Sequence, residues 1–357
     1  MLNCRYAMKN EELTMKQIYI LLAALLLPVV AKAQFVIDTP NPMVKFRMAQ
    51  SAISNLYVDK VDDNKLVEDA IRGMLKELDP HSTYSNPDEV KALTEPLQGN
   101  FEGIGVQFNV VEDTLMVIQP ITNGPSERVG IVAGDRIVSV NDTAIAGVKM
   151  KKEDMMKRLR GPKGTKVKLG VVRPGAGKPL SFMVVRDKIP VYSIHASYMI
   201  RPGVGYVRIE QFAQNTYDEF MRAVGRLREQ GMQTLIIDLQ DNGGGYLQTA
   251  VQIGNEFLQR GDLVVYTEGR STPRQTFNAD GRGSLRDLDL YVLMNEFSAS
   301  ASEILAGAIQ DQDRGTVVGR RSFGKGLVQR PIEFSDGSMI RLTIAHYYTP
   351  SGRCIQK

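Results

Sequence analysis

The hydrophobic pattern of this chain changes its period twice, and that change limits the fold more than any other feature. Residues 41–95 place apolar side chains at spacings of three and four, which predicts amphipathic helices. Residues 100–187 show short runs of β character, and from about Pro190 onward strand-like and helix-like segments alternate. The sequence therefore predicts a small helical N-terminal region, a compact β-rich unit and an α/β layered region.

The composition and charge are ordinary for a globular protein. The chain has 357 residues, of which 43% are hydrophobic and 24% are charged, and its net charge is +4. This balance does not require nucleic acid as a partner, and we expect none. We place the boundaries at a signal peptide (1–33), a helical N-terminal region (34–97), a β-rich domain (98–188) and an α/β core (189–357).

The first residues are typical of an export signal. Lys16 precedes an apolar run from Ile18 to Val30, and Ala31-Lys32-Ala33 fits a small-x-small cleavage site. The apolar run is shorter than the ~20 residues that a membrane span needs. An uncleaved anchor is the alternative, and Met15 is an alternative start. We expect an exported periplasmic protein with no integral membrane span after cleavage.

The cysteines and histidines argue against a disulfide framework and a metal site. Cys4 would leave with the signal peptide and Cys354 would stand alone, so an intramolecular disulfide is excluded in the mature protein. The three histidines, His81, His195 and His346, have no metal-ligand spacing. We expect neither a metal nor a cofactor.

The β-rich unit contains a glycine loop followed by a strand. Backbone N–H groups of such a loop can hold a chain-terminal carboxylate, and the strand Val106–Val110 can accept a peptide as an added strand. A hairpin with glycines at bulges is the alternative. The downstream run Ala133–Asn141, Ala-Gly-Asp-Arg-Ile-Val-Ser-Val-Asn, makes this unit resemble a PDZ domain. The predicted peptide-binding residues are Gly103, Ile104, Gly105 and Val106.

A second glycine-rich turn follows a predicted buried strand. Thr234–Leu239 runs into Gln240-Asp241-Asn242-Gly243-Gly244-Gly245. Backbone amides of this turn can approach a ligand closely, and acyl transfer needs such donors because the tetrahedral intermediate carries an oxyanion. A simple turn before the next helix is the alternative.

Three serines near residue 300 are candidates for a nucleophile. The run Ser300-Ala301-Ser302-Glu303 has the pattern of a capping box, so Ser300 can be only a helix cap. The same position presents a serine oxygen at the positive end of a helix, beside free amides. Ser298 and Ser302 compete with Ser300, and spacing alone does not choose among the three.

A serine hydroxyl needs a neighbouring base to become a nucleophile, and Lys325 is a candidate for that base. Lysine has an ordinary pKa of ~10.4, so it can act as a base only where burial keeps it neutral. Lys325 lies in a glycine-framed turn before Leu327, which indicates a packed turn, although a surface lysine is the usual alternative. Gln329 would face the same side of the following strand and orient the amine. Asp311 either holds local geometry or is exposed to solvent.

Together these segments resemble the carboxyl-terminal processing (tail-specific) proteases, peptidase family S41. The resemblance rests on Asp241–Gly245, Ser298–Asp311 and Phe323–Gly326, and it extends from about residue 43 to the end. The PDZ-like unit and Leu78–Tyr84 lie where this family puts them. The family implies a crotonase-like (ββα) serine protease core, α/β in class, with an inserted PDZ domain.

The resemblance also implies a role for each site residue. It makes Ser300 the nucleophile, Lys325 the general base and Gln329 the positioning partner of Lys325. The oxyanion hole falls on the N–H groups of Gly245 and Ala301, and Asp311 matches an aspartate with a supporting role.

Two features depart from the family. Phe297 stands where many members have glycine, which should alter packing more than chemistry. Similar members usually continue past Lys357, so we expect the C-terminal part of the core to be missing.

The leading hypothesis is an exported serine endopeptidase. It would bind protein substrates with apolar C-termini through the PDZ domain and cleave them with a Ser-Lys dyad. The alternatives are a non-catalytic peptide-binding or scaffold protein, and a glycine-rich pocket that holds a small apolar ligand. Homo-oligomerisation is left open by the sequence.

Overall fold

The computed structural model describes residues 41–357. The predicted signal peptide, its cleavage site, the alternative start and Cys4 lie outside the described residues. The chain divides into two compact units, Met1–Asp69 and Ala70–Lys357. Between residues 41 and 357, no helix combines the length and the apolar character that a membrane span requires.

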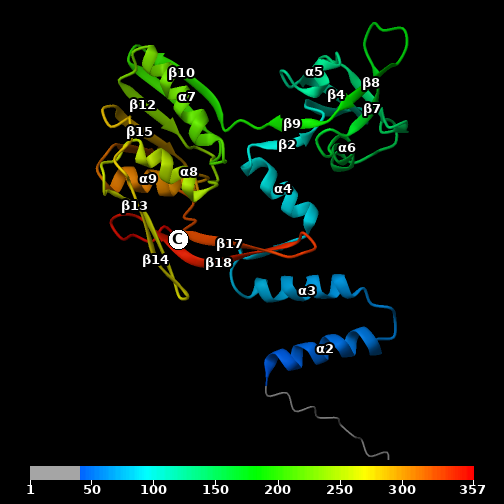
Figure 1. The fold of residues 1–357 in the computed structure, drawn as a ribbon, viewed down its shortest axis with the longest axis horizontal. Helices are drawn as coiled ribbons and strands as arrows, with labels where there is room; N and C mark the ends of the chain where they lie inside the picture. Colours follow the sequence, from blue (N-terminus) through cyan, green and yellow to red (C-terminus); the bar gives the residue numbers. More distant parts are fainter. Residues whose placement is uncertain (1–40) are drawn as a thin grey trace, which may run out of the picture. The chain divides into compact units, whose positions relative to one another are not determined.

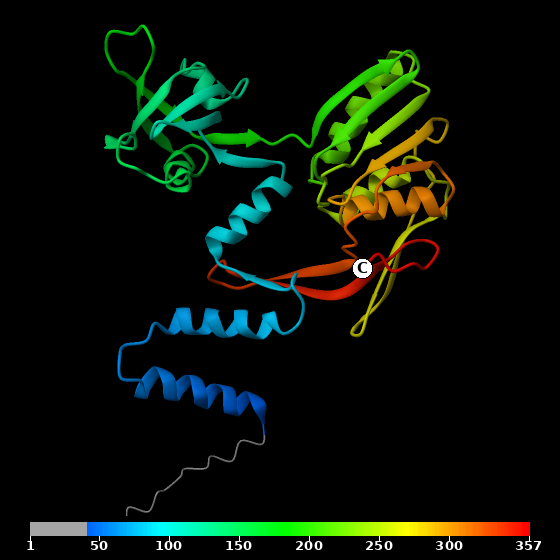
Figure 2. The ribbon, with the colours of Figure 1, turned by 180° about the vertical axis from the view of Figure 1, so that it is seen from behind.

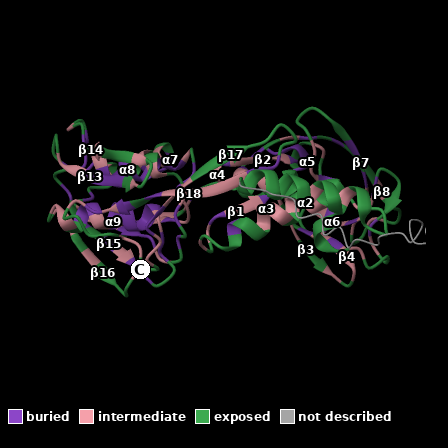
Figure 3. Cartoon of the chain, turned by 90° about the horizontal axis from the view of Figure 1, so that it is seen from below, coloured by how far each residue is buried: buried purple, intermediate pink, exposed green. Residues whose placement is uncertain are grey.

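The helical periodicity of the N-terminal region is confirmed. The helices there are α2 (Pro42–Leu56), α3 (Asp63–Lys76) and α4 (Pro87–Leu97). Asn41 caps α2 because its side chain accepts a hydrogen bond from the Met43 N–H, at 2.8 Å. No side chain of α2 is buried, as the green colour of this helix shows in Figure 3. Helix α4 begins with a capping box between Asn86 and Glu89.

The β-rich unit is an antiparallel sheet of six strands with two short helices. Its strands are β3 (Val106–Val111), β4 (Thr114–Pro120), β5 (Arg136–Val140), β6 (Thr143–Ala144), β7 (Lys166–Val172) and β8 (Leu180–Val185), and its helices are α5 (Pro125–Arg128) and α6 (Lys152–Leu159). The order is β3-β4-β5-β7-β8, with β6 beside β5, so β3 is an edge strand. Leu115, Ile137, Met155 and Leu169 are completely buried in its core.

Two short strands flank this unit in the sequence. They are β2 (Asn100–Gly103) and β9 (Asp187–Pro190), and they pair with each other in antiparallel fashion. The chain therefore enters and leaves the β-rich unit side by side.

The following region has a five-stranded sheet with helices against it (Figure 1). The strand order is β10 (Ile194–Arg201), β11 (Val204–Ile209), β12 (Thr234–Asp238), β15 (Asp289–Met294) and β16 (Thr316–Gly319). The last four strands are parallel, and β10 is antiparallel to β11. The helices are α7 (Thr216–Glu229), α8 (Leu247–Asn255) and α9 (Ala301–Asp311).

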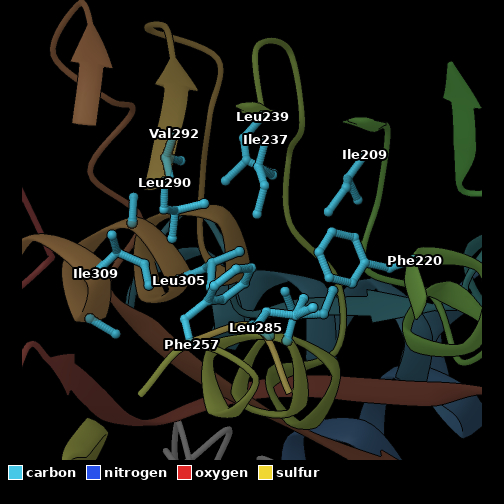
Figure 4. Packing of buried hydrophobic residues seen from close by; sticks show 14 of the residues in the cluster. Ile209, Phe220, Ile237, Leu239, Phe257, Leu285, Leu290, Val292, Leu305 and Ile309 are labelled. Atoms are coloured by element: carbon cyan, nitrogen blue, oxygen red, sulfur yellow. The ribbon is translucent and has the colours of Figure 1, made fainter. Parts of the chain in front are cut away.

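The core of this region lies between the sheet and the three helices. Figure 4 shows Ile237 of β12 and Val292 of β15 pointing toward Phe257 and Leu305. Burial of these apolar side chains, at ~25 cal/mol per Å², is the main favourable contribution to the packing of the sheet against the helices. The expected α/β layer architecture is confirmed, whereas the stacked ββα arrangement stays a prediction.

A second sheet joins segments that are far apart in the sequence. Its order is β1 (Thr83–Ser85), β18 (Met339–Tyr348), β13 (Leu263–Gly269) and β14 (Thr272–Asn278), with β17 (Leu327–Glu333) also paired to β18. The β17–β18 hairpin is the orange-to-red ribbon in Figure 2. In β1, Thr83 pairs with Arg341 of β18, a pairing that the local pattern did not predict.

The run Thr216-Tyr217-Asp218-Glu219 has the sequence pattern of a capping box, which predicts that a helix begins there. Helix α7 does begin at Thr216, but the predicted capping box is wrong. Asn215 is the N-cap residue and makes no side-chain cap hydrogen bond. The Glu219 carboxylate instead accepts hydrogen bonds from the N–H groups of Ser193 (2.7 Å) and Ile194 (3.1 Å). The Glu219 carboxylate therefore makes a tertiary contact and does not cap helix α7.

Candidate active site

Two adjacent parallel strands bring the glycine turn and the serine segment together. Strands β12 and β15 are neighbours, so the segments after their carboxyl ends meet at one edge of the sheet, where α/β proteins usually bind ligands. The Ala299 N–H donates to the Asn242 carbonyl at 3.0 Å. The Asp241 N–H donates to Oδ1 of Asn295 at 3.0 Å, which ties the two turns again.

The three candidate serines have different surroundings. Ser298 Oγ donates to the Leu239 carbonyl at 2.7 Å, and Ser302 Oγ donates to the Asn242 carbonyl at 3.0 Å. Both of these side chains are completely buried. Ser300 is only half-buried. Two of the three hydroxyls therefore hold the turns together, and Ser300 is the one that solvent reaches.

Ser300 has an unusual backbone conformation. Its φ of 56° and ψ of −113° are rare for a residue with a side chain, and it sits on the sharp turn between β15 and α9. A strained serine on a strand-to-helix turn is how the hydrolase nucleophile elbow exposes its oxygen. Gly244 approaches it so closely that an added Cβ would lie 2.8 Å from the Ser300 Cβ. Only glycine fits there without a backbone shift.

The carboxylate of Glu303 joins the serine segment to the lysine turn. Its Oε2 atom accepts the backbone N–H of Ser300 at 2.8 Å and the backbone N–H of Lys325 at 2.9 Å. Its Oε1 atom accepts the Ser322 hydroxyl and the Gly324 N–H, both at 2.7 Å. The side chain is 6% exposed. The predicted capping contact with Ser300 is confirmed. The hydrogen bond from the Lys325 N–H to the same carboxylate was not predicted from the sequence.

Replacing Glu303 with glutamine is expected to lower kcat/KM about 100-fold. The amide has one acceptor oxygen, so one pair of the four donors must face an NH₂ group. Either the Ser300–Lys325 pair or the Ser322–Gly324 pair is lost, and a displacement of about 1 Å can cost 10²-fold in rate. Steady-state cleavage of an unfolded substrate by E303Q measures this loss.

A second buried carboxylate provides the control for that prediction. Glu256 is 5% exposed and accepts hydrogen bonds from Tyr217 and from the N–H and hydroxyl of Ser284. E256Q should lower thermal stability and leave kcat/KM of the folded protein within about twofold. Equal losses of kcat/KM in E303Q and E256Q would contradict a positioning role for Glu303.

Lys325 lies in an environment that favours its neutral form. Burial lowers the pKa of its ammonium below the ordinary value, and the positive charge of Arg341 lowers this pKa further. The carboxylate of Glu303 opposes both effects without reversing them. The predicted packed turn is confirmed, since Lys325 is half-buried and β17 begins at Leu327.

Gln329 makes a different contact from the one that strand alternation suggests. Its Nε2 atom donates to the backbone carbonyl of His81. A register irregularity lies between Val328 and Gln329, so simple alternation does not decide which side Gln329 shares with Lys325. The contact ties β17 to the segment before β1. A role of Gln329 in orienting the lysine amine stays a prediction.

The two backbone N–H groups of the predicted oxyanion hole, those of Gly245 and Ala301, have no protein acceptor in the described part of the chain, and their role stays a prediction. Gly245 and Phe212 are paired in an isolated parallel bridge. The hydrogen bonds of this bridge come from the residues on either side of Gly245 and do not use the Gly245 N–H. Ala301 is the first residue of α9, where N–H groups lack intrahelical acceptors. The N–H of Gly244, by contrast, is bound to Oδ1 of Asn242 at 2.8 Å.

Asp311 ties the end of α9 to a turn after β18. It accepts the Ser351 N–H at 3.0 Å and the Ser351 hydroxyl at 2.6 Å, and it pairs with Arg353. Burial raises the pKa of Asp311, but hydrogen bonds from Ser351, Thr349 and Arg353 outweigh burial and leave this pKa below its ordinary value. These contacts agree with a supporting role, which stays a prediction.

The predicted peptide-binding loop lines a cavity of ≈ 170 Å³ in the β-rich unit. The cavity is lined by Gly103–Val106, by apolar residues of β2, β3 and α6, and by Arg160. The Ile104 carbonyl is fixed by Ser126 and the Gly105 carbonyl accepts the Ile121 N–H at 3.0 Å. The cavity lies next to the edge strand β3, as peptide addition requires.

Within the described residues, no group of three His, Cys, Asp or Glu side chains could hold a metal ion. The described Cys354 is an exposed free thiol.

Three parts of the chain match known families. Residues 203–357 match peptidase family S41, and residues 103–185 match the PDZ domain. Residues 28–89 match the family described as the activating protease CtpB N-terminal domain.

Curated relatives and a solved structure match most of the chain. The carboxy-terminal-processing protease of Bartonella bacilliformis is 34% identical over 323 residues, which cover 89% of this chain and 74% of that protein. The carboxy-terminal processing protease CtpB of Bacillus subtilis is 36% identical over 333 residues, which cover 92% and 68%. The solved photosystem II D1 C-terminal processing protease is 32% identical, covers 88% of this chain and 90% of that chain, and has a TM-score of 0.49.

Proposed function

Because the chain belongs to peptidase family S41, the carboxy-terminal processing serine proteases, we propose that it cleaves polypeptides with a Ser300–Lys325 dyad. The observation that carries this proposal is the single carboxylate oxygen of Glu303 that accepts the backbone N–H groups of both residues. Such a bridge holds two segments in one geometry, which is what proximity catalysis requires.

The proposed mechanism begins with neutral Lys325. Its amine takes the proton from Ser300 Oγ while this oxygen attacks the scissile carbonyl carbon. The resulting oxyanion is stabilised by the N–H groups of Gly245 and Ala301. The Lys325 ammonium then gives its proton to the leaving amine, and an acyl-enzyme remains on Ser300. Water, deprotonated by the same lysine, hydrolyses the ester and restores both side chains.

The proposed substrate is an extended polypeptide held by its C-terminus. The chain contains a PDZ domain, and PDZ domains bind peptides by adding a strand beside a carboxylate-binding loop. Apolar walls in the ≈ 170 Å³ cavity favour an apolar C-terminal side chain. Gly103–Val106 would bind the carboxylate. An exported location in the periplasm is proposed from the sequence pattern of residues 1–33. The curated relatives carry protease names, which does not favour the binding-module alternative.

Removing the apolar tail from a substrate should lower kcat/KM about 100-fold, because a tethered chain end raises the effective concentration of the cleavable segment. The measurement compares one unfolded protein that ends in apolar residues with the same protein ending in two aspartates. A Ser300→Ala variant should bind a fluorescent peptide bearing the apolar tail as tightly as the wild type. Equal cleavage of both substrates would contradict recognition through the C-terminus.

A further inference from the structure

We propose that Asp241 and Asn295 are positioning residues, whose paired side chains hold the glycine turn in register with the segment of Ser300. The inference rests on the proposed function, because the glycine turn supplies one proposed oxyanion donor and the serine segment supplies the proposed nucleophile. Neither side chain takes part in the proposed chemical steps. Their contribution is to the geometry in which those steps occur.

The two residues exchange a reciprocal pair of hydrogen bonds. The Asp241 N–H donates to Asn295 Oδ1 at 3.0 Å, and Asn295 Nδ2 donates to Asp241 Oδ1 at 2.8 Å. Asp241 lies in the turn after β12, and Asn295 directly follows β15. Two bonds between the same residues fix their orientation as well as their distance, and the bond to the carboxylate is charge-assisted. The pair therefore joins the two turns on which the proposed site is built.

The amide of Asn295 can lie in only one orientation. Its Oδ1 atom accepts the Phe297 N–H at 3.0 Å in addition to the Asp241 N–H, so each turn directs one backbone donor at the same oxygen. Turning the amide over would place its NH₂ group against both donors. Asn295 is 6% exposed, so water could not fully replace these bonds. The NH₂ group must therefore face position 241, and an acceptor is required there.

The pair acts on the backbone at both proposed reacting groups. On the serine side, the Asn295 N–H donates to Ser298 Oγ at 2.9 Å, two residues before Ser300. On the glycine side, Asp241 has a φ of 64°, in the left-handed region that residues with side chains seldom adopt. Gly245 follows four residues later. A contact that stabilises this conformation helps to set the direction in which the chain approaches the proposed oxyanion donor.

The second carboxylate oxygen of Asp241 has a different partner. Arg208 of β11 places its Nη2 atom 3.6 Å from Asp241 Oδ2, and its Nε atom donates to Glu210 at 2.6 Å. The Asp241 side chain is 56% exposed, so this ion pair contributes little energy. Removing the charge at position 241 should therefore matter much less than removing the acceptor that faces Asn295.

Replacing Asn295 with aspartate (N295D) tests the pair with almost no change of shape. The new carboxylate still accepts the N–H groups of Asp241 and Phe297, but an oxygen now stands where the NH₂ group faced Asp241 Oδ1. The two carboxylates repel each other, and a displacement of about 1 Å can cost 10²-fold in rate. We expect kcat to fall about 10-fold or more. KM for a tail-bearing unfolded protein should stay within about twofold, because the proposed tail-binding loop does not contact the pair.

The reversed pair D241N/N295D is the decisive variant. Its new amide at position 241 can donate to the new carboxylate at position 295, so the lost hydrogen bond forms again in the opposite direction. We expect kcat within about threefold of the wild type, although it contains the substitution that impairs N295D. D241N alone keeps an acceptor oxygen and should also stay within about threefold. Such non-additivity shows that the two side chains act on the rate through each other.

A second pair of the same kind provides the matched control. Asn255 ends α8, at the opposite end of that helix from the glycine turn. Its Oδ1 atom accepts the Asp280 N–H at 2.7 Å, and its side chain also hydrogen-bonds to the Asp280 carboxylate. N255D places two carboxylates together in the same way, outside the proposed site. It should lower thermal stability and leave kcat within about twofold of the wild type.

Asp241→Gly gives a test that introduces no repulsion. Glycine adopts a positive φ readily, so the turn can keep its conformation while the carboxylate is removed. Because Asp241 is more than half exposed, this variant should fold even where N295D does not. We expect its kcat to fall about fivefold, with KM nearly unchanged. All rates are expressed per active site, counted by labelling with a fluorophosphonate, so a loss of folded protein does not lower them.

The outcomes separate this inference from the proposed function. Wild-type kcat in both N295D and Asp241→Gly would overturn the positioning role and leave the peptidase proposal standing. A reversed pair that regains wild-type stability but remains as slow as N295D would overturn it too, as would equal losses of kcat in N255D and N295D. If the wild type shows no Ser300-dependent cleavage, the proposed function falls together with this role.

Discussion

Replacing Ser300 with alanine is expected to abolish peptide cleavage. The nucleophilic oxygen is removed, and no acyl-enzyme can form on the remaining methyl group. In serine hydrolases whose catalytic residues act as a unit, loss of the nucleophile lowers kcat by about 10⁶-fold. Cleavage of an unfolded, tail-bearing protein followed by gel and mass spectrometry measures the loss. Folding should be preserved because Ser300 is at the surface end of its turn and only half-buried.

Ser298 is the matched control for this substitution. Its hydroxyl donates to the Leu239 carbonyl and accepts the Asn295 N–H at 2.9 Å, and Ser298→Ala would take this acceptor away from the buried Asn295 N–H. We expect Ser298→Ala to lower the free energy of unfolding by about 1–3 kcal/mol. The folded variant should still react with a serine-directed fluorophosphonate, whereas Ser300→Ala should not. Turnover by Ser300→Ala, or labelling that depends on Ser298 instead, would refute the assignment.

The local sequence does not identify which of the three serines is the candidate nucleophile. All three fit a turn before a helix, and their spacing gives no reason to prefer one. The difference lies in long-range partners, since Ser298 and Ser302 bond to carbonyls of the segment after β12. Strand β12 and the serine segment become neighbours only through the parallel pairing of β12 with β15. Such a pairing is decided by the packed core, which no local pattern encodes.

Glu303 and Glu219 both stand at the last position of a capping-box pattern, but only Glu303 makes the contact that the pattern predicts. The pattern at Glu303 is met, with its carboxylate bonded to the Ser300 N–H. The same pattern at Glu219 fails, because the carboxylate binds the backbone of Ser193 and Ile194. Helix positions were predictable from apolar periodicity, which reflects burial of one face. The partners of a buried carboxylate depend on which distant N–H groups the fold leaves unpaired.

The family resemblance covers Leu78–Tyr84, but the sequence predicted no contact for this segment. In the structure it reaches the proposed site, where the His81 carbonyl accepts Gln329 Nε2 and β1 pairs with β18. Arg341 of β18 carries the positive charge that, after burial, lowers the pKa of Lys325. The environment of the proposed base is thus assembled by antiparallel pairing between residues that are far apart in the chain, and this pairing has no short-range signature.

The pH dependence of cleavage tests Lys325 as the base. Burial and the charge of Arg341 lower the pKa of Lys325, so its neutral form begins to accumulate below the ordinary value of 10.5. Deprotonation creates the active form. The rate should therefore rise with pH through the lowered pKa, with a midpoint below 10.5. Lys325→Arg should lower kcat by about 10³-fold or more at every pH, because a guanidinium does not deprotonate in this range.

The Arg341→Gln variant also tests Lys325 as the base, and it leaves Ser300 and Lys325 themselves unchanged. Removing the positive charge takes away one of the two effects that lower the pKa of Lys325, so the rising limb should move to higher pH. The rate on the alkaline plateau should change much less than the rate at neutral pH, since the neutral amine is still formed there. A rising limb that stays at the same pH in Arg341→Gln would show that another group titrates. Normal turnover by Lys325→Arg would exclude Lys325 as the base altogether.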